Sequence, residues 1–203
     1  IPSGKLHIVG NPVLENVTKY EYSTNDELEW RNNFGLSKGR KVITFVSESF
    51  KDDFKDDSPE FQGFNEFNVL NDILEVLNNE SILIIKLHPA EVSNKYDFCL
   101  KNPNIFIVDE TDINKLIEFS DIIIGMGSML LIEASIINGA VYSYRPNEKI
   151  EFIGNKNGMV KKIHNKIELK EKLSTYKAES FVVTNNVFIG STKNIINVIQ
   201  KSL

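Results

Sequence analysis

Two short runs of this sequence consist almost entirely of large aliphatic residues and do not alternate with polar ones. They are Ser81–Leu87 and Asp121–Ile124. Strands that are apolar on both faces are typical of a parallel sheet covered by helices, because such a sheet has no face in water. These two runs therefore favour an α/β fold.

The remaining segments alternate between strand and helix signals. Further strands are predicted at Lys5–Val9, Lys41–Val46, Asn104–Val108, Ala140–Tyr144 and Met159–Ile163. Helices are predicted at Asn25–Asn33 (capped by Thr24 or Asn25), Asn65–Leu77, Ser93–Leu100, Asp112–Phe119, Ser128–Asn138, Lys166–Tyr176 and Thr192–Ser202. The acidic segment Ser47–Gly63 is predicted as a loop. This order predicts a doubly wound, Rossmann-like parallel sheet of about six strands with helices on both faces.

Length and charge narrow the class of protein. The 203 residues fit a single domain, 1–203. A net charge of −5 argues against a nucleic-acid-binding domain, which usually carries a basic face. The single cysteine excludes a disulfide framework, and no apolar run is long enough to span a membrane. We interpret the start at Ile1 as a cut at a domain boundary of a longer, cytoplasmic protein.

The strongest candidate site is the turn that follows Asp121–Ile124. In open parallel sheets, ligands bind at the carboxyl ends of the strands. Gly125 and Gly127 allow a tight turn, and the N–H groups of Gly127, Ser128 and Met129 would face a phosphate at the start of a helix. The third glycine of the dinucleotide fingerprint is absent. The alternative is a tight turn in which Ser128 acts only as a helix cap.

Two ionisable residues are further candidates. Glu133 is the one acid in an otherwise apolar helix, so it must reach solvent, a cation or a ligand hydroxyl such as that of a ribose. The alternatives are an exposed position or an internal salt bridge. His88 ends a buried strand, and Pro89 favours an extended backbone there. Its imidazole can donate to a phosphate or act as an acid, and the alternative is a packed histidine.

Weaker signals follow the strand Lys41–Val46. Ser47 and Ser49 are candidate contacts for a phosphate or sugar, and the alternative is a polar turn. No cluster has metal-ligand spacing, and no Ser/His/Asp triad is apparent. We therefore expect neither a metal nor another cofactor.

Four motifs in register resemble the C-terminal half of glycosyltransferases with the two-domain B fold. They are HIVGNPV at 7–13, FVSE at 45–48, KLHP at 86–89 and IGMGSMLLIEA at 124–134. The chain is most similar to bacterial capsule sialyl- and polysialyltransferase-like proteins and to UDP-N-acetylglucosamine 2-epimerases. The resemblance extends from about Leu6 to Leu173. Two departures concern the donor: Gly127 precedes Ser128 where sialyltransferases usually have paired serines, and only Glu133 stands where the epimerases have paired glutamates.

The resemblance implies a nucleotide-sugar-binding domain with a UDP- or CMP-linked donor. His88 and Ser128 would contact the nucleotide or its phosphates, and Glu133 would lie near the ribose. The acceptor and the catalytic base would belong to an N-terminal domain absent from this chain. The chain alone is then expected to be inactive, and contact with the inner face of a membrane would occur through that missing half. The alternatives are a sugar-nucleotide epimerase and a nucleotide-binding domain without catalytic activity.

Overall fold

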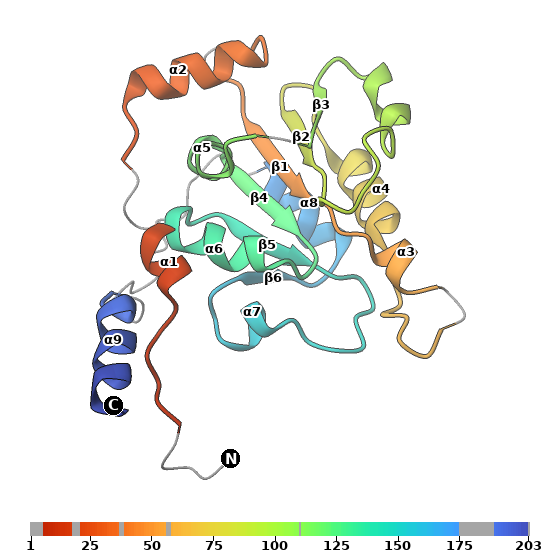
Figure 1. The fold of residues 1–203 in the computed structure, drawn as a ribbon. Helices are drawn as coiled ribbons and strands as arrows, with labels where there is room; N and C mark the ends of the chain where they lie inside the picture. Colours follow the sequence, from red (N-terminus) through yellow and green to blue (C-terminus); the bar gives the residue numbers. More distant parts are fainter. Residues whose placement is uncertain are drawn as a thin grey trace.

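The core of the molecule is one six-stranded parallel sheet with the strand order β3-β2-β1-β4-β5-β6 (Figure 1). The computed structural model describes residues 6–17, 21–36, 39–55, 58–109, 111–174 and 189–202. The strands are β1 (Val42–Val46), β2 (Ile82–Lys86), β3 (Ile105–Val108), β4 (Ile122–Gly125), β5 (Val141–Tyr144) and β6 (Lys161–Ile163). The predicted Rossmann-like fold class is confirmed.

Helices cover both faces of this sheet. They are α1 (Pro12–Val17), α2 (Thr24–Asn33), α3 (Phe50–Asp53), α4 (Glu66–Val76), α5 (Ile113–Phe119), α6 (Met129–Ile137), α7 (Ile153–Lys156), α8 (Lys166–Ser174) and α9 (Ser191–Ser202), with a 3₁₀ helix η2 at Asp97–Lys101. The buried side chains of α4 and α8 pack on one face. Those of α2, α5 and α6 pack on the other.

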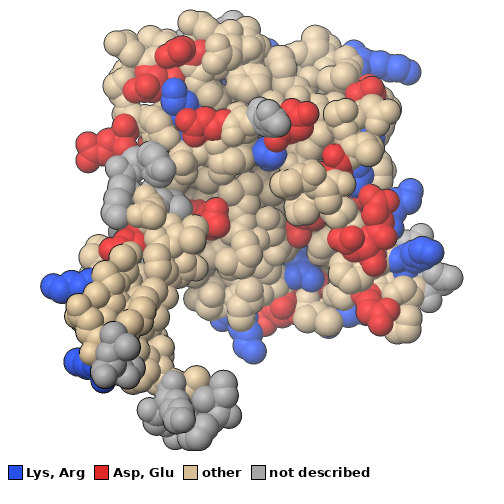
Figure 2. All heavy atoms as spheres, viewed as in Figure 1, with Lys and Arg blue, Asp and Glu red and all other residues tan. Residues whose placement is uncertain are grey.

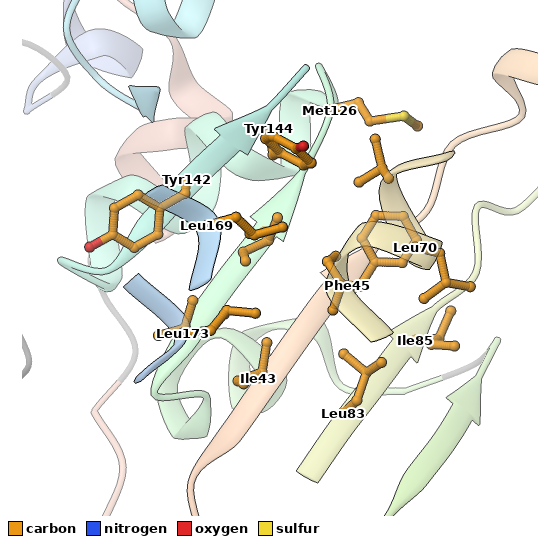
Figure 3. Close-up of a cluster of buried hydrophobic side chains, with 14 of the residues drawn as sticks. Ile43, Phe45, Leu70, Leu83, Ile85, Met126, Tyr142, Tyr144, Leu169 and Leu173 are labelled. Carbon is orange, nitrogen blue, oxygen red and sulfur yellow. The ribbon is translucent and has the colours of Figure 1, made fainter. Parts of the chain in front are cut away.

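Successive residues of the strands point to opposite faces, which divides the core in two. Ile43 and Phe45 of β1 lie with Leu70 of α4 in the cluster on one face (Figure 3). Val42 lies in the cluster of Trp30 on the other face. Burial of a side chain of this size contributes about 1.5–3 kcal/mol. The double-sided burial explains why the strand sequences lack polar alternation.

Three central strands end at the same level. Val46, the last residue of β1, pairs with Lys86 of β2 and with Gly125 of β4. The chain passes from β1 outward through β2 to β3 and then returns to the other side of β1 as β4. A crevice forms at the carboxyl ends of the strands where the direction of winding reverses, so this edge is where a ligand is expected.

The predicted first strand, Lys5–Val9, was wrong for the residues that the structure describes. Leu6–Val9 form no strand, and the side chain of Ile8 is fully exposed. An apolar segment becomes a strand only where a neighbouring strand accepts its hydrogen bonds, and none adjoins this segment. Instead, α1 begins at Pro12, a residue that suits the first helical position because it needs no N–H partner there.

Three other predicted segments differ from the structure. Ser93–Leu100 is not an α-helix, because only the 3₁₀ helix η2 forms there. The helix buries Cys99, and Tyr96, the buried residue just before it, lies three positions earlier, which matches the three-residue turn of a 3₁₀ helix. The predicted loop Ser47–Gly63 contains α3. Helix α2 is capped by Ser23 rather than by Thr24 or Asn25.

On the face shown in Figure 2, acidic and basic side chains are interspersed, and no continuous basic surface is visible there. Among the described residues, no helix is both long and apolar enough to cross a membrane.

Candidate functional site

A pocket of about 440 Å³ opens at the carboxyl edge of the sheet. Its lining comes from the ends of β1, β2 and β3 and from the first residues of α5 and α6: Val46, Ser47, Lys86, Leu87, His88, Pro89, Asp109, Thr111, Ile113, Ser128 and Leu130. The pocket therefore lies beside the point where the winding reverses, at the position expected for a ligand in this fold.

Three of the residues predicted from the sequence line this pocket. They are Ser47, His88 and Ser128. The other predicted residues lie outside its lining: Ser49, Gly125, Gly127, Met129 and Glu133. The nucleotide-binding role predicted for all of these residues stays a prediction.

Ser128 caps α6 and lines the pocket at the same time. Its Oγ accepts a hydrogen bond from the N–H of Leu130 at 3.1 Å. The hydroxyl hydrogen has no acceptor among the residues that the structure describes, so it is available to a ligand. Ser128 can therefore cap the helix and contact a phosphate in the same conformation.

The backbone N–H of Gly127 donates a hydrogen bond to the carboxylate of Glu48. Glu48 Oε1 accepts from Gly127 N at 2.7 Å and from Met126 N at 3.2 Å. Burial raises the pKa of Glu48, although hydrogen bonds from these N–H groups and the charge of Arg145 act in the opposite direction. A phosphate could reach the N–H of Gly127 only if Glu48 moved. Glu48 ends the FVSE motif at 45–48, but no role was predicted for it.

His88 is exposed and its ring is held by the turn that follows β2. Its Nδ1 accepts a hydrogen bond from the N–H of Ala90 at 3.2 Å. In a neutral imidazole the proton then lies on Nε2, because one ring nitrogen donates while the other accepts. His88 therefore offers Nε2–H as a donor at the pocket.

Lys86 was missed by the sequence analysis. It is the last residue of β2 and is only 7% exposed, yet it lines the pocket. Its Nζ donates to the carbonyl oxygens of Leu87 at 2.6 Å and Asp109 at 2.7 Å. Burial lowers the pKa of Lys86, and Asp109 and Glu91 partly offset this. A lysine ending an aliphatic strand was the available signal.

The ammonium of Lys86 has a third hydrogen. No acceptor for it occurs in the described part of the chain, so it remains for a ligand. Lys86 and His88 at the end of β2 and Ser128 at the start of α6 thus bring a cation and two further donors to one cavity. Such a set suits an anion with several oxygens, as phosphates have.

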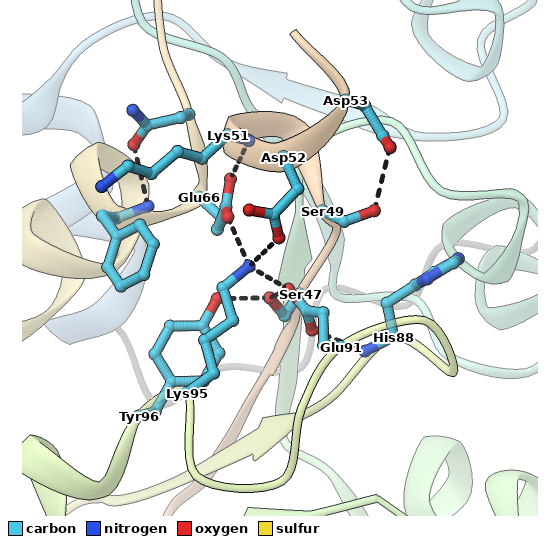
Figure 4. A network of polar contacts seen from close by, with 12 residues as sticks. Ser47, Ser49, Lys51, Asp52, Asp53, Glu66, His88, Glu91, Lys95 and Tyr96 are labelled. Carbon is cyan, nitrogen blue, oxygen red and sulfur yellow. Dashed lines mark hydrogen bonds and ion pairs between the residues drawn. The ribbon is translucent and has the colours of Figure 1, made fainter. Parts of the chain in front are cut away.

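The hydroxyls of Ser47 and Ser49 both donate to carboxylates of this chain. Ser47 Oγ donates to Glu91 Oε1 at 2.8 Å and lies 2.5 Å from the hydroxyl of Tyr96 (Figure 4). Ser49 Oγ donates to Asp53 Oδ2 at 2.9 Å. Both hydroxyls therefore already donate within the protein, and the N–H of Ser47 donates to the carbonyl oxygen of Lys86 at 2.9 Å.

Glu133 is half-buried on α6, one turn after Met129. Among the described residues its carboxylate has no hydrogen-bond or ion-pair partner, and burial raises its pKa. The same part of the chain holds no group of three or more His, Cys, Asp or Glu placed to bind a metal ion.

No protein-family model matches the sequence, and no curated protein matches it. Several solved structures have a similar fold. The UDP-GlcNAc 2-epimerase of Methanocaldococcus jannaschii is 16% identical with a TM-score of 0.61, and the match covers 100% of this chain and 57% of that one. The E. coli ADP-heptose LPS heptosyltransferase II is 14% identical with a TM-score of 0.54, covering 77% and 52%.

The wall teichoic acid polymerase TagF, in crystals soaked with CDPG, is 15% identical with a TM-score of 0.54, covering 99% of this chain and 51% of that one. The chain thus spans about half the length of each of these proteins. At such low identity the likeness concerns the fold alone. The predicted similarity to B-fold glycosyltransferases and to UDP-N-acetylglucosamine 2-epimerases is confirmed at that level.

Proposed function

We propose that this chain is the nucleotide-sugar-binding half of a B-fold glycosyltransferase that acts in the synthesis of a surface polysaccharide or glycoconjugate. The observation that carries the proposal is the convergence of Lys86, His88 and Ser128 on one pocket at the carboxyl edge of the sheet. In this proposal the phosphate of a UDP- or CMP-linked donor binds there. The second domain, with the acceptor and the catalytic base, completes the cleft.

These donors would do more than bind the substrate. In an inverting transfer, the acceptor oxygen forms a bond to the anomeric carbon while the bond from that carbon to the phosphate oxygen breaks. A base takes the acceptor proton, and the electron pair of the broken bond stays on the phosphate. Lys86 and the Nε2–H of His88 would stabilise this added negative charge, which lowers the barrier because the charge is greatest late in the reaction.

Titration calorimetry with CMP, CDP, UDP and GDP tests the proposal. We expect weak binding of at least one nucleotide. Lys86→Met and His88→Ala should each weaken it about tenfold, because a hydrogen bond to a charged group contributes about 1.5–3 kcal/mol. Ser128→Ala should have a smaller effect on affinity. His164→Ala is the control, since His164 is exposed and does not line the pocket.

The absence of a binding signal for every nucleotide at millimolar concentration would overturn the proposal. Unchanged affinity in both the Lys86 and the His88 variants would also overturn it. A protein that also contains the second domain separates the transferase from its alternatives. Release of a free nucleotide together with a glycosylated acceptor supports the transferase. An epimerised sugar nucleotide identifies an epimerase, and binding without any turnover identifies a domain that only binds nucleotides.

A further inference from the structure

A closed turn follows β2 and holds His88 in place. The N–H of Glu91 donates to the carbonyl oxygen of His88 at 2.9 Å. In return, the N–H of His88 donates to Glu91 Oε2 at 2.7 Å. Pro89 occupies the second position of this turn, where its fixed φ is favoured. The main chain of His88 is thereby tied to a single carboxylate.

The other oxygen of that carboxylate reaches the end of β1. Glu91 Oε1 accepts from Ser47 Oγ at 2.8 Å and from Lys95 Nζ at 2.7 Å. The side chain of Glu91 is completely buried. Figure 4 shows its carboxylate beside Ser47 and Lys95. The carboxylate of Glu91 therefore joins Ser47, the residue after β1, to His88, which lies two residues after the end of β2.

The charge of Glu91 is balanced inside the protein. Burial opposes the charge of Lys95, but its hydrogen bonds to Glu66 and Glu91 raise its pKa above the usual value. The side chain of Lys95 is 7% exposed and also lies 3.8 Å from Asp52. A paired, hydrogen-bonded carboxylate of this kind is rigid, because each of its oxygens has fixed donors.

We propose that Glu91 is the positioning residue of the pocket, holding His88 and the end of β1 in the arrangement that directs the imidazole Nε2–H to the nucleotide phosphate. This inference rests on the proposed function. Glu91 does not line the pocket itself. It acts through His88 and Ser47, whose places relative to each other decide where the donors of the pocket converge.

The chain contains a matched control for this role. Glu66 is also completely buried and also pairs with Lys95. Its second oxygen accepts from the N–H of Lys51 in α3, at 2.8 Å, and not from a pocket residue. Glu66→Gln and Glu91→Gln therefore remove the same charge from the same lysine, and only the second touches His88.

The experiment compares nucleotide affinity in Glu91→Gln and Glu66→Gln by titration calorimetry, alone and combined with His88→Ala. We expect Glu91→Gln to weaken binding about tenfold and Glu66→Gln by less than about twofold, because only the former disturbs a hydrogen bond to a charged phosphate. In the His88→Ala background, Glu91→Gln should have almost no further effect, since the residue it positions is gone. Equal losses in both variants, or additive losses with His88→Ala, would overturn the proposal.

A measurement on the ligand-free protein tests the positioning role of Glu91 independently of the proposed function. Hydrogen exchange measured by NMR should show a protected amide at His88 in the wild type and in Glu66→Gln, and faster exchange in Glu91→Gln. Protection retained in Glu91→Gln would refute the positioning role even if no nucleotide binds. Should Glu91→Gln fail to fold, Glu91→Asp keeps the charge opposite Lys95 while shortening the reach to His88 by one methylene, and the same outcomes apply.

Discussion

At the scale of single residues, carboxylates decide how the carboxyl edge of the sheet is organised. Glu48 accepts from the N–H groups of the β4–α6 turn, and Glu91 binds the turn after β2. Glu133 differs from both, because it has no partner among the described residues. A half-buried carboxylate without a partner is destabilising when ionised.

The pH dependence of stability tests the state of Glu133. Its folded pKa is raised by burial, so the protonated form is favoured in the folded protein. Its contribution to stability is complete below the unfolded pKa and is lost as the pH rises through the folded pKa. Glu133→Gln should therefore raise the melting temperature at pH 7, and the gain should shrink towards pH 4.

Thermal melts of the free protein at both pH values give this comparison. Glu118→Gln on α5 is the control, because Glu118 is exposed. A lower melting temperature for Glu133→Gln at pH 7 would mean that the carboxylate has a favourable partner after all.

At the scale of elements, the turn from β4 to α6 depends on one of its two glycines. A Cβ built on Gly125 would lie 3.1 Å from Leu131 Cδ2 and 3.2 Å from the carbonyl oxygen of Val46. At Gly127 the nearest atoms are 3.6 Å away, an ordinary contact distance, and its φ is not positive. The close approach of α6 to the sheet therefore requires Gly125 rather than Gly127.

Alanine substitutions at Gly125 and Gly127 should have clearly different effects on the free energy of unfolding. Gly125→Ala is expected to lower the free energy of unfolding by about 1–3 kcal/mol, because a backbone oxygen of β1 cannot move aside. Gly127→Ala should change it by less than about 0.5 kcal/mol. Urea denaturation of both variants measures the difference, and similar losses at the two positions would contradict this account.

At the scale of the whole molecule, helix α1 near the start of the described chain and helix α9 near its end form one unit. Helix α9 packs against α1 (Figure 1). Glu15 of α1 accepts from the N–H groups of Gly190 and Thr192, each at 3.0 Å, and so caps α9 across a large sequence separation. Gly10, at φ +86°, approaches Ser191 so closely that a Cβ would lie 2.1 Å from its Oγ.

Removing this cap should loosen α9 without changing the pocket. In Glu15→Ala we expect faster hydrogen exchange over Ser191–Ser202, corresponding to the loss of about 0.5–2 kcal/mol that an N-cap contributes. Nucleotide affinity should stay the same, since none of these residues lines the pocket. Glu29→Ala, at an exposed position of α2, should leave the exchange of α9 unaltered. Unchanged exchange in Glu15→Ala would show that packing against α1 alone holds the helix.

The length of the chain relative to the similar structures bears on the proposed two-domain organisation. The pocket has donors for an anion, and the match with the solved structures of similar fold covers only 51–57% of those chains. The domain assignment of 1–203 remains a prediction.

The sequence by itself determined the sheet and most of its helices. Aliphatic runs such as Ile82–Lys86 can only be buried on both faces, and the 3.6-residue period of α4 indicates one buried side. Local chemistry also placed Asn65, Asp112 and Ser128 at helix starts, where their side chains accept from free N–H groups. It predicted a site at the strand ends because ligands of such sheets bind where the winding reverses.

Only the tertiary structure decided which groups meet in the pocket. Glu48 and Gly127 are 79 residues apart, and Ser47 and Glu91 are 44 apart, so no local pattern could reveal these hydrogen bonds. The same long-range packing left Leu6–Val9 without a partner strand. The directions of the side chains depend on strand register and on the turn after β2, and these are set by packing across the whole sheet.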